Sequence, residues 1–455
     1  MIFIGLLLAA AATVYAQVTV GVTADMVIVP FQYIQGVDYE RSDGTSGRHD
    51  GMMGTGIGRI DGQAGPRIRL DARAVNEEHG AGLRLRLQAQ ANADGAASVG
   101  VENFLQAWWA PLDWLRLDAG RFDDDRLRGM VGDDEMHSFS VLMYDEDALF
   151  NRIRARSGLM ASFTPIEGLL VTALLDNLNP LVRESHNVDA PLGTNPGYRP
   201  EHHRPGFPQL TFVPWDSRFG DGRVWRHIHL AAGYNIRDIG MVRVQYIGAI
   251  PEAPSLSADA TELDINPNAV AAPRIEAAFA FTGVEGLLVD IGGKVPLPIN
   301  ESFPGRSETW QAPFRVSLGA RYALGNFEIA GRVDAGFGGE KREDSGTLSF
   351  APKLNAHLWP SYDFGAFRAI LNAGFEWVGQ TSRTVNSSAV NGGGNAATTI
   401  IGDGGKRFGV GLSVQSSIMG RFMVRGGLAY RFPSEVNGIQ ERGVFSIPLF
   451  LEYSF

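Results

Sequence analysis

Residues 67–74 read RIRLDARA and residues 83–90 read LRLRLQAQ, so apolar and polar side chains alternate in both stretches. Successive side chains of a β-strand point to opposite faces, and the alternation therefore gives each strand one apolar face and one charged face. The pattern recurs near the N-terminus, in residues 18–26, and late in the chain, in residues 314–322 and 445–455. The sequence predicts an all-β protein built of amphipathic strands.

The composition of the 455-residue chain favours many short strands joined by tight turns. Glycine supplies 56 residues, about 12% of the chain against a usual share near 7%, and aromatic residues supply 10%. The formal net charge of −10 argues against a generally basic nucleic-acid surface. Because the chain has no cysteine, disulfide bonds, cysteine-based zinc sites and a catalytic thiol are excluded.

The first residues predict an export signal. Residues 2–16 read IFIGLLLAAAATVYA, an apolar run that ends in Val14-Tyr15-Ala16, as at a signal-peptidase site, although no basic residue precedes it. A buried strand or helix is the alternative interpretation. The run is shorter than the roughly 20 residues that a transmembrane helix needs. We therefore expect a signal peptide over residues 1–16, and no later apolar run is long enough for a helical inner-membrane protein.

The alternating segments number about 18, and their connections are of two kinds. Short connections lie at residues 76–80, 111–113, 164–168, 236–240, 282–286, 324–326, 361–365 and 417–421; long ones lie at about 31–64, 122–151, 178–222, 251–273, 295–312 and 378–405. Short turns at one end and long loops at the other are typical of an up-and-down transmembrane antiparallel β-barrel. About 16 strands are the alternative, if one hairpin lies outside the wall. No domain boundary is visible, so residues 17–455 are predicted to form one barrel domain.

Two further expectations follow from the faces of these strands. The apolar residues should face lipid and be exposed on the isolated chain; this expectation is made for Leu70, Leu85, Leu318 and Leu371. Apolar-face aromatic residues gather beside the short turns and indicate an interfacial girdle at one rim, formed by Trp114, Phe163, Tyr322, Phe327 and Phe455 among others.

The chain ends in Tyr453-Ser454-Phe455, at the close of a strongly alternating segment. With this ending and the alternation before it, the chain resembles the Gram-negative bacterial outer-membrane porins. The resemblance implies recognition of Tyr453 and Phe455 by the barrel-assembly machinery, short turns on the periplasmic side and location in the outer membrane. It also implies a possible homotrimer, and a third outer loop, here residues 122–151, that folds back into the pore.

The predicted constriction joins that acidic loop to a basic wall. The loop carries Asp123, Asp124, Asp125, Asp133, Asp134 and Glu135, while the inner faces of the neighbouring strands carry Arg67, Arg69, Arg73, Arg84, Arg86, Arg116, Arg152, Arg154 and Arg156. Opposite charges across a narrow passage would select solutes by charge and polarity. The alternative is that these arginines merely face water and that the loop is solvated at the surface.

Other constellations are weaker. His227 and His229 share a strand face but lack a third metal ligand, and the acids at 123–125 and 133–135 lack the spacing of a calcium loop. His137 lies near Ser138 and Ser140 without an orienting partner for hydrolysis. We therefore expect no cofactor, no metal and no enzymatic activity.

The predicted function is passive diffusion of small hydrophilic solutes or ions across an outer membrane, with the surrounding lipids as the other partner and no nucleic acid. A circumference of this size is too wide for side chains to fill. The alternatives are a receptor, adhesin or structural surface protein and, with less support, a barrel hydrolase.

Overall fold

The structure of the protein is a computed structural model. It describes residues 17–40, 46–58, 66–91, 97–124, 126–127, 153–176, 228–248, 273–303, 306–311, 313–343, 346–386, 397–402, 404–418, 420–436 and 439–454. Within these ranges the regular elements are β-strands, and none of the described residues forms a helix long and apolar enough to cross a membrane.

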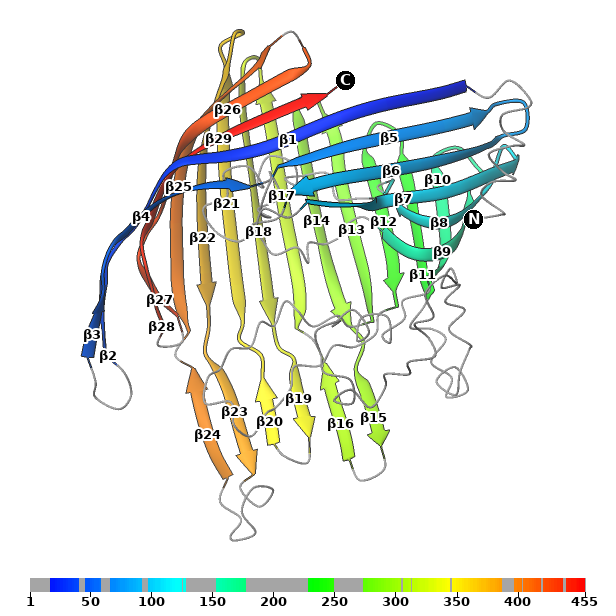
Figure 1. The fold of residues 1–455 in the computed structure, drawn as a ribbon. Coiled ribbons are helices and arrows are strands. Elements are labelled where there is room, and N and C mark those ends of the chain that lie inside the picture. The colour runs from blue at the N-terminus through cyan, green and yellow to red at the C-terminus, as the bar shows by residue number, and fades with distance from the viewer. Residues whose placement is uncertain are drawn as a thin grey trace.

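A closed antiparallel barrel of 18 strands forms the body of the molecule (Figure 1). Its strands, in order around the wall, are β1 (Gln17–Ile34), β5 (Arg67–Asn76), β6 (Ala81–Ala91), β7 (Ala97–Leu112), β8 (Leu115–Asp124), β9 (Ile153–Phe163), β10 (Leu169–Asp176), β11 (Ile228–Ile236), β12 (Gly240–Ile247), β13 (Arg274–Val284), β14 (Leu287–Pro296), β17 (Phe314–Leu324), β18 (Phe327–Phe337), β21 (Lys353–Asp363), β22 (Arg368–Val378), β25 (Gly405–Ile418), β26 (Phe422–Arg431) and β29 (Val444–Ser454). The predicted fold class and strand number are confirmed.

The first strand closes the barrel. β1 pairs with β29 on one side, where Thr23 lies opposite Ser454, and with β5 on the other, where Gln17 lies opposite Val75. Its second half, from residue 27 on, pairs instead with β4 (Met52–Gly58) at the rim. The first residue of β1 and the last residue of β29 therefore both lie toward the end of the barrel that carries the short turns.

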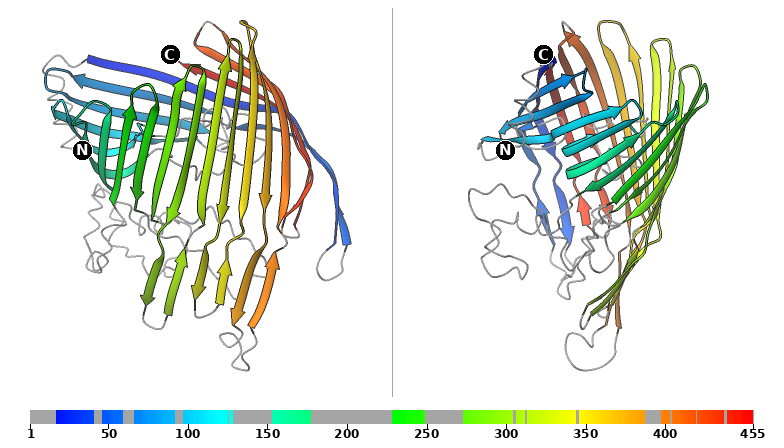
Figure 2. Two further views of the ribbon diagram at one scale, coloured as in Figure 1. Left: turned by 180° about the vertical axis from the view of Figure 1, so that it is seen from behind. Right: turned by 90° about the vertical axis from the view of Figure 1, so that its right-hand side faces the viewer.

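The short turns and the long connections lie at opposite ends of the wall, as predicted (Figure 2). The turn between β13 and β14 shows why glycine is needed there. Gly286 has a φ of 75°, and a Cβ at this position would lie 2.4 Å from the carbonyl oxygen of Ala323. Glycine adopts this conformation freely and leaves room for the neighbouring strand.

The barrel has an apolar outer face and a polar inner face. Leu70, Leu318 and Leu371 are exposed on the outside, at 38%, 46% and 46%, as expected. Leu85, for which exposure was also expected, is half-buried. On the inside, Arg243 and Glu276 are almost fully buried among other polar groups. This distribution is the reverse of that in a water-soluble protein and is typical of a barrel whose outside faces lipid.

Exposed aromatic residues lie near both ends of the outer face. At the short-turn end, Trp114, Tyr322 and Phe327 are exposed as predicted, Phe163 is half-buried, and Phe455 lies outside the described residues. The same end carries the stacked rings of Phe364 and Phe367. The prediction of a girdle at one rim missed a second group at the opposite end, which includes the stacked pair Phe314–Phe337 and the tilted pair Phe408–Phe432.

The spacing of these two groups matches a bilayer. Phe327 and Phe337 are the first and last residues of β18. Ten steps of about 3.4 Å give about 34 Å along the strand, which is about 26 Å along the axis at a tilt of about 40°. The apolar band of outer-membrane barrels is about 25 Å tall.

Three neighbouring long connections extend the wall beyond the barrel in a separate six-stranded sheet, seen at the lower edge of Figure 1. It is formed by β15 (Ile299–Phe303), β16 (Arg306–Gln311), β19 (Glu340–Glu343), β20 (Gly346–Ser349), β23 (Thr381–Asn386) and β24 (Ala397–Gly402). The alternation of apolar and polar residues predicts a wall strand from about residue 347, but this stretch belongs to β20, and the wall strand β21 begins at Lys353. Smaller hairpins are formed by β2 (Val37–Glu40) with β3 (Ser46–His49) and by β27 (Ser434–Val436) with β28 (Ile439–Glu441).

Neighbouring residues of β17 allow a test of the two faces. Leu318 is exposed on the outer face, and Ser317 is half-buried on the inner face. We expect Leu318→Arg to destabilise the barrel in a bilayer by about 2–4 kcal/mol, because the charge would sit at mid-depth in lipid. Ser317→Arg should cost much less, since its guanidinium reaches the polar interior. Denaturant midpoints of both variants in lipid vesicles measure this difference, and equal costs would contradict the assignment of the faces.

Candidate functional site

Most of the arginines that the sequence predicts to form a basic wall belong to β5, β6 and β8. Arg67, Arg69, Arg84, Arg86 and Arg116 all occupy inward positions of these strands. Arg154 and Arg156 belong to β9, but their side chains lie outside the described part of the chain, as does Arg152 altogether.

Each of these arginines that has a described partner is held by a carboxylate of the wall itself. The Nε of buried Arg67 donates to Asp25 at 2.7 Å, and the two residues lie opposite each other on the paired strands β5 and β1. Arg84 and Arg86 share Asp71, each donating through Nε and Nη2 at 2.7–3.0 Å. The sequence prediction named the arginines but not these carboxylates.

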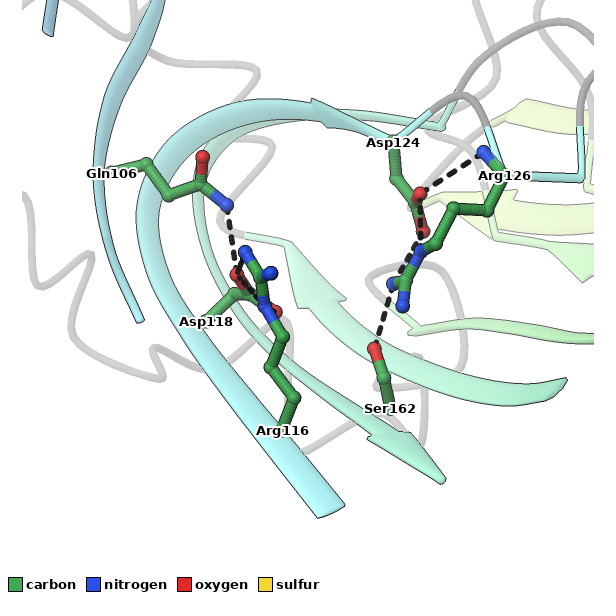
Figure 3. Close-up of polar contacts among 6 residues, drawn as sticks. All are labelled: Gln106, Arg116, Asp118, Asp124, Arg126 and Ser162. Atoms are coloured by element: carbon green, nitrogen blue, oxygen red, sulfur yellow. Dashed lines mark hydrogen bonds and ion pairs between the residues drawn. The ribbon is translucent and has the colours of Figure 1, made fainter. Parts of the chain in front are cut away.

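Arg116 repeats the arrangement on the next strands. Its Nε and Nη2 donate to Asp118, and the amide nitrogen of Gln106 donates to the same carboxylate at 2.8 Å (Figure 3). Asp118 is buried, with 2% of its surface exposed. A buried carboxylate is costly unless it is paired and hydrogen-bonded, and these contacts satisfy that requirement.

Two aromatic rings of β7 lie under the guanidinium groups. The Cζ atoms of Arg84 and Arg86 are 3.6 and 4.8 Å from the ring centre of Phe104. Those of Arg73 and Arg116 are 5.2 and 5.0 Å from the ring centre of Trp108. At these distances a cation is attracted by the ring, which helps to hold the guanidinium groups against the wall.

A glycine permits the position of Trp108. Gly82 of β6 pairs with Trp108 across the strands, and a Cβ on Gly82 would lie only 2.1 Å from Cζ2 of the indole. The ring therefore lies close against the backbone of β6, and any larger residue at position 82 would displace it.

Ion pairs continue around the rest of the inner face. They are Arg243–Asp290, Arg274–Glu276, Arg332–Asp334, Arg368–Glu328 and Arg407–Glu376. Arg243 and Arg332 are nearly inaccessible, with side-chain exposures of 0% and 7%, whereas Arg84 and Arg116 expose 31% and 38%. The guanidinium groups on β6 and β8 are thus more accessible than those of the buried ion pairs on β12 and β18.

The connection between β8 and β9 begins on the inner face of the barrel. Asp123 and Asp124, predicted as loop residues, form the end of β8. Arg126 donates from Nε and Nη2 to Asp124 at 2.8 and 2.9 Å, and from Nη2 to Ser162 of β9 at 2.7 Å (Figure 3). Burial acts to lower the pKa of Arg126, but its hydrogen bonds and charge interactions with Asp124 outweigh this and raise the pKa above its ordinary value.

Leu127 lies in an apolar seat on the inner wall, and the sequence prediction missed it. The seat consists of the buried residues Phe104, Phe122, Met160, Leu174 and Ala231, with Leu170 and Met241 packed against it. Leu127 is 5% exposed, and its Cδ2 would lie 2.3 Å from a Cβ on Gly233 of β11. Burial of a leucine contributes about 1.5–3 kcal/mol, so this contact holds the first residues of the connection on the inside.

The other predicted site residues lie mostly outside the described ranges. These are Asp125, Asp133, Asp134, Glu135, His137, Ser138, Ser140, His227 and Phe455. His229 is buried on the inner face of β11, and Tyr453 is exposed near the end of β29. Among the described residues, no three His, Asp or Glu side chains are grouped as a metal site would require.

The fold and its inner face define a closed antiparallel β-barrel with a polar, charge-paired interior. No family model and no curated protein matches the chain. Among solved structures, the chain is similar to an anion-selective porin from Comamonas acidovorans, with 11% identity, 97% of this chain and 100% of that chain covered, and a TM-score of 0.43. It is also similar to the outer membrane channel DcaP of Acinetobacter baumannii, with 8% identity, 97% of each chain covered and a TM-score of 0.44. OpdK of Pseudomonas aeruginosa gives 12% identity, 95% and 98% coverage and a TM-score of 0.45.

Proposed function

We propose that the protein is a water-filled channel through which small hydrophilic solutes cross the outer membrane of a diderm bacterium by diffusion. The observation that carries the proposal is the reversed polarity of the closed barrel. An apolar outer face with aromatic residues near both ends suits a bilayer. The inner face, in contrast, carries many charged side chains, which suits an interior that is filled with water.

The size of the barrel leaves room for solutes. With about 4.8 Å between strands and a tilt of about 40°, 18 strands give a circumference of about 113 Å. A circular barrel of this circumference has a backbone diameter of about 36 Å, which a layer of side chains on each side does not fill. Barrels of similar width enclose aqueous channels.

The β8–β9 connection (residues 125–152) supplies the proposed constriction. Its first residues are held inside the barrel by the Arg126 contacts and by the Leu127 seat. From that starting point the acidic residues that follow can lie opposite the accessible arginines of β6 and β8. Opposite charges across the passage would select solutes by charge.

The remaining parts of the proposal concern the lipids and proteins that the barrel would contact. Outer-membrane lipids would contact the apolar face, the barrel-assembly machinery would recognise Tyr453 and Phe455, and assembly as a homotrimer is proposed on the resemblance to porins.

Conductance of the purified protein in a planar lipid bilayer tests the proposed function. We expect stepwise increases in current as single molecules insert, with a linear dependence on voltage. A correctly folded, inserted protein that passes no current would overturn the channel proposal and favour a receptor or structural role.

A substitution in the Leu127 seat tests whether the connection narrows the channel. Gly233→Ala places a methyl group where Leu127 now lies, so we expect Leu127 to leave its seat and the single-channel conductance to rise. Because the seat is worth about 1.5–3 kcal/mol, its loss should increase the undocked population about tenfold or more. The matched control is Gly336→Ala on the inner face of β18, where the nearest atom is 3.8 Å from the added Cβ. An equal conductance in both variants would refute a role for the seat.

A further inference from the structure

We propose that the accessible guanidinium edges of Arg84, Arg86 and Arg116 form a saturable binding site for small organic carboxylates inside the barrel. The inference rests on the proposed channel function and deepens it by naming a class of solute. A row of charges changes only the relative permeability to cations and anions. A binding site, in contrast, binds solutes that carry one chemical group and becomes saturated as their concentration rises.

The hydrogen bonds of the wall orient these guanidinium groups. Arg84 and Arg86 each use Nε and Nη2 to bind Asp71, and Arg116 uses the same two atoms to bind Asp118. A guanidinium is a planar fork with donors on two edges. The Nε edge of each guanidinium is held by a carboxylate of the wall, so the edge that carries Nη1 can donate hydrogen bonds to a solute. Because the side chain is already held in place, it loses little conformational freedom when the solute binds.

The exposures of these side chains agree with that geometry. Arg84, Arg86 and Arg116 expose 31%, 21% and 38% of their side chains, while the carboxylate of Asp118 exposes only 1%. Asp118 is thus far more enclosed than Arg116, and Asp71, at 25% exposure, is shared by two guanidinium groups of similar exposure. The charge presented to the interior is therefore mainly positive.

The local charge balance also favours an anion. Next to Phe104 and Trp108, the described inner face of β5–β8 carries the guanidinium groups of Arg73, Arg84, Arg86 and Arg116 and the carboxylates of Asp71 and Asp118. Two positive charges are left over in this cluster. Carboxylates match the planar fork and accept two parallel hydrogen bonds from it.

The aromatic residues favour an anion with an organic body. Trp108 is half-buried, so part of its ring remains accessible beside the guanidinium groups of Arg73 and Arg116. Because Gly82 lets the indole lie against the wall, the ring and the cations are presented side by side. A planar, apolar solute body can contact this surface while its carboxylate binds the arginines, which chloride and phosphate cannot do.

Titration calorimetry of the full-length folded protein in detergent tests the site directly. We expect benzoate to bind at one saturable site, acetate to bind more weakly, and phosphate and chloride to show no saturable binding in the same range. Arg84→Lys and, separately, Arg116→Lys keep the charge but remove the fork. Each should weaken benzoate binding about tenfold. The matched control is Arg368→Lys on β22, since Arg368 is similarly exposed, at 28%, and paired with Glu328. It should leave binding unchanged.

The outcomes separate the site from the channel. The site would be overturned if benzoate did not bind or if acetate and phosphate bound equally well. It would also be overturned if all three variants weakened benzoate binding to the same extent. Conductance in potassium chloride is measured on the same preparations and reports the channel independently, as well as the folding of each variant. A protein that conducts but does not bind benzoate refutes this inference alone, whereas one that binds benzoate without conducting refutes only the channel.

Discussion

Deletion of residues 131–147 is expected to raise the single-channel conductance about twofold, because the segment would no longer occupy part of a lumen about 36 Å wide between backbones. The deletion should leave the barrel intact. Asp124 and Ile153 lie opposite each other at the ends of β8 and β9, so the shortened connection has almost no distance to span. Single-channel recordings of the variant in a planar bilayer measure the increase.

A deletion of equal length in a different connection provides the control. Removal of residues 190–206, between β10 and β11, should leave the conductance unchanged, since the proposed constriction does not include this connection. If both deletions raise the conductance equally, the β8–β9 connection has no special role. If neither does, the channel is unconstricted by residues 131–147.

The wall of the barrel was predictable from the sequence, and the reason is physical. Strands between lipid and a polar interior alternate over most of their length, because each outward charge is costly. The segment of residues 67–74 is an example: its leucine and isoleucine face outward and its arginines inward. Short turns place consecutive strands next to each other in the wall, and the 18 strands form a closed barrel, as expected.

The outer sheet was less predictable. Residues 347–349 alternate like a wall strand, yet they pair with residues 340–342 and 382–384 outside the barrel. Local alternation cannot distinguish a strand at membrane depth from one that continues the wall beyond it. The nearby aromatic pair Phe314–Phe337, which lies near one edge of the apolar band, gives the better boundary.

The candidate site was predicted only in part. The sequence indicated which arginines face inward but not that Asp25, Asp71 and Asp118 pair with them. A signal was present, because Asp71 and Asp118 occupy the same strand faces as the arginines. The Leu127 seat had no such signal, since its residues come from five separate strands and a connection, and their contact arises only when the barrel closes.

The pairing of two arginines with one carboxylate makes the charge of the wall unusually easy to reverse. Arg84, Arg86 and Asp71 together carry one positive charge. Arg84→Gln with Arg86→Gln leaves Asp71 alone, so the cluster changes to one negative charge. We expect this double variant to shift ion selectivity toward cations, and the addition of Arg152→Gln and Arg154→Gln to shift it further.

The size of the shift follows from Coulomb's law. At about 8 Å in water, each removed charge changes the energy of a passing ion by about 0.5 kcal/mol. Two charges therefore change the difference between a cation and an anion by about 2 kcal/mol without salt. At 0.1 M salt, with a Debye length of about 10 Å, about 0.9 kcal/mol remains, which is about a fivefold change in the permeability ratio.

The salt dependence and a charge-balancing control make the prediction specific. At 1 M salt the Debye length is about 3 Å, and the shift should nearly vanish. Asp71→Asn in the double variant removes the remaining negative charge and should return about half of the shift at 0.1 M salt. Reversal potentials across a salt gradient measure the ion selectivity of the wild-type protein and of each variant. A shift that ignores Asp71→Asn, or that persists at 1 M salt, would mean that the variants alter the shape of the passage and not the electrostatic potential along it.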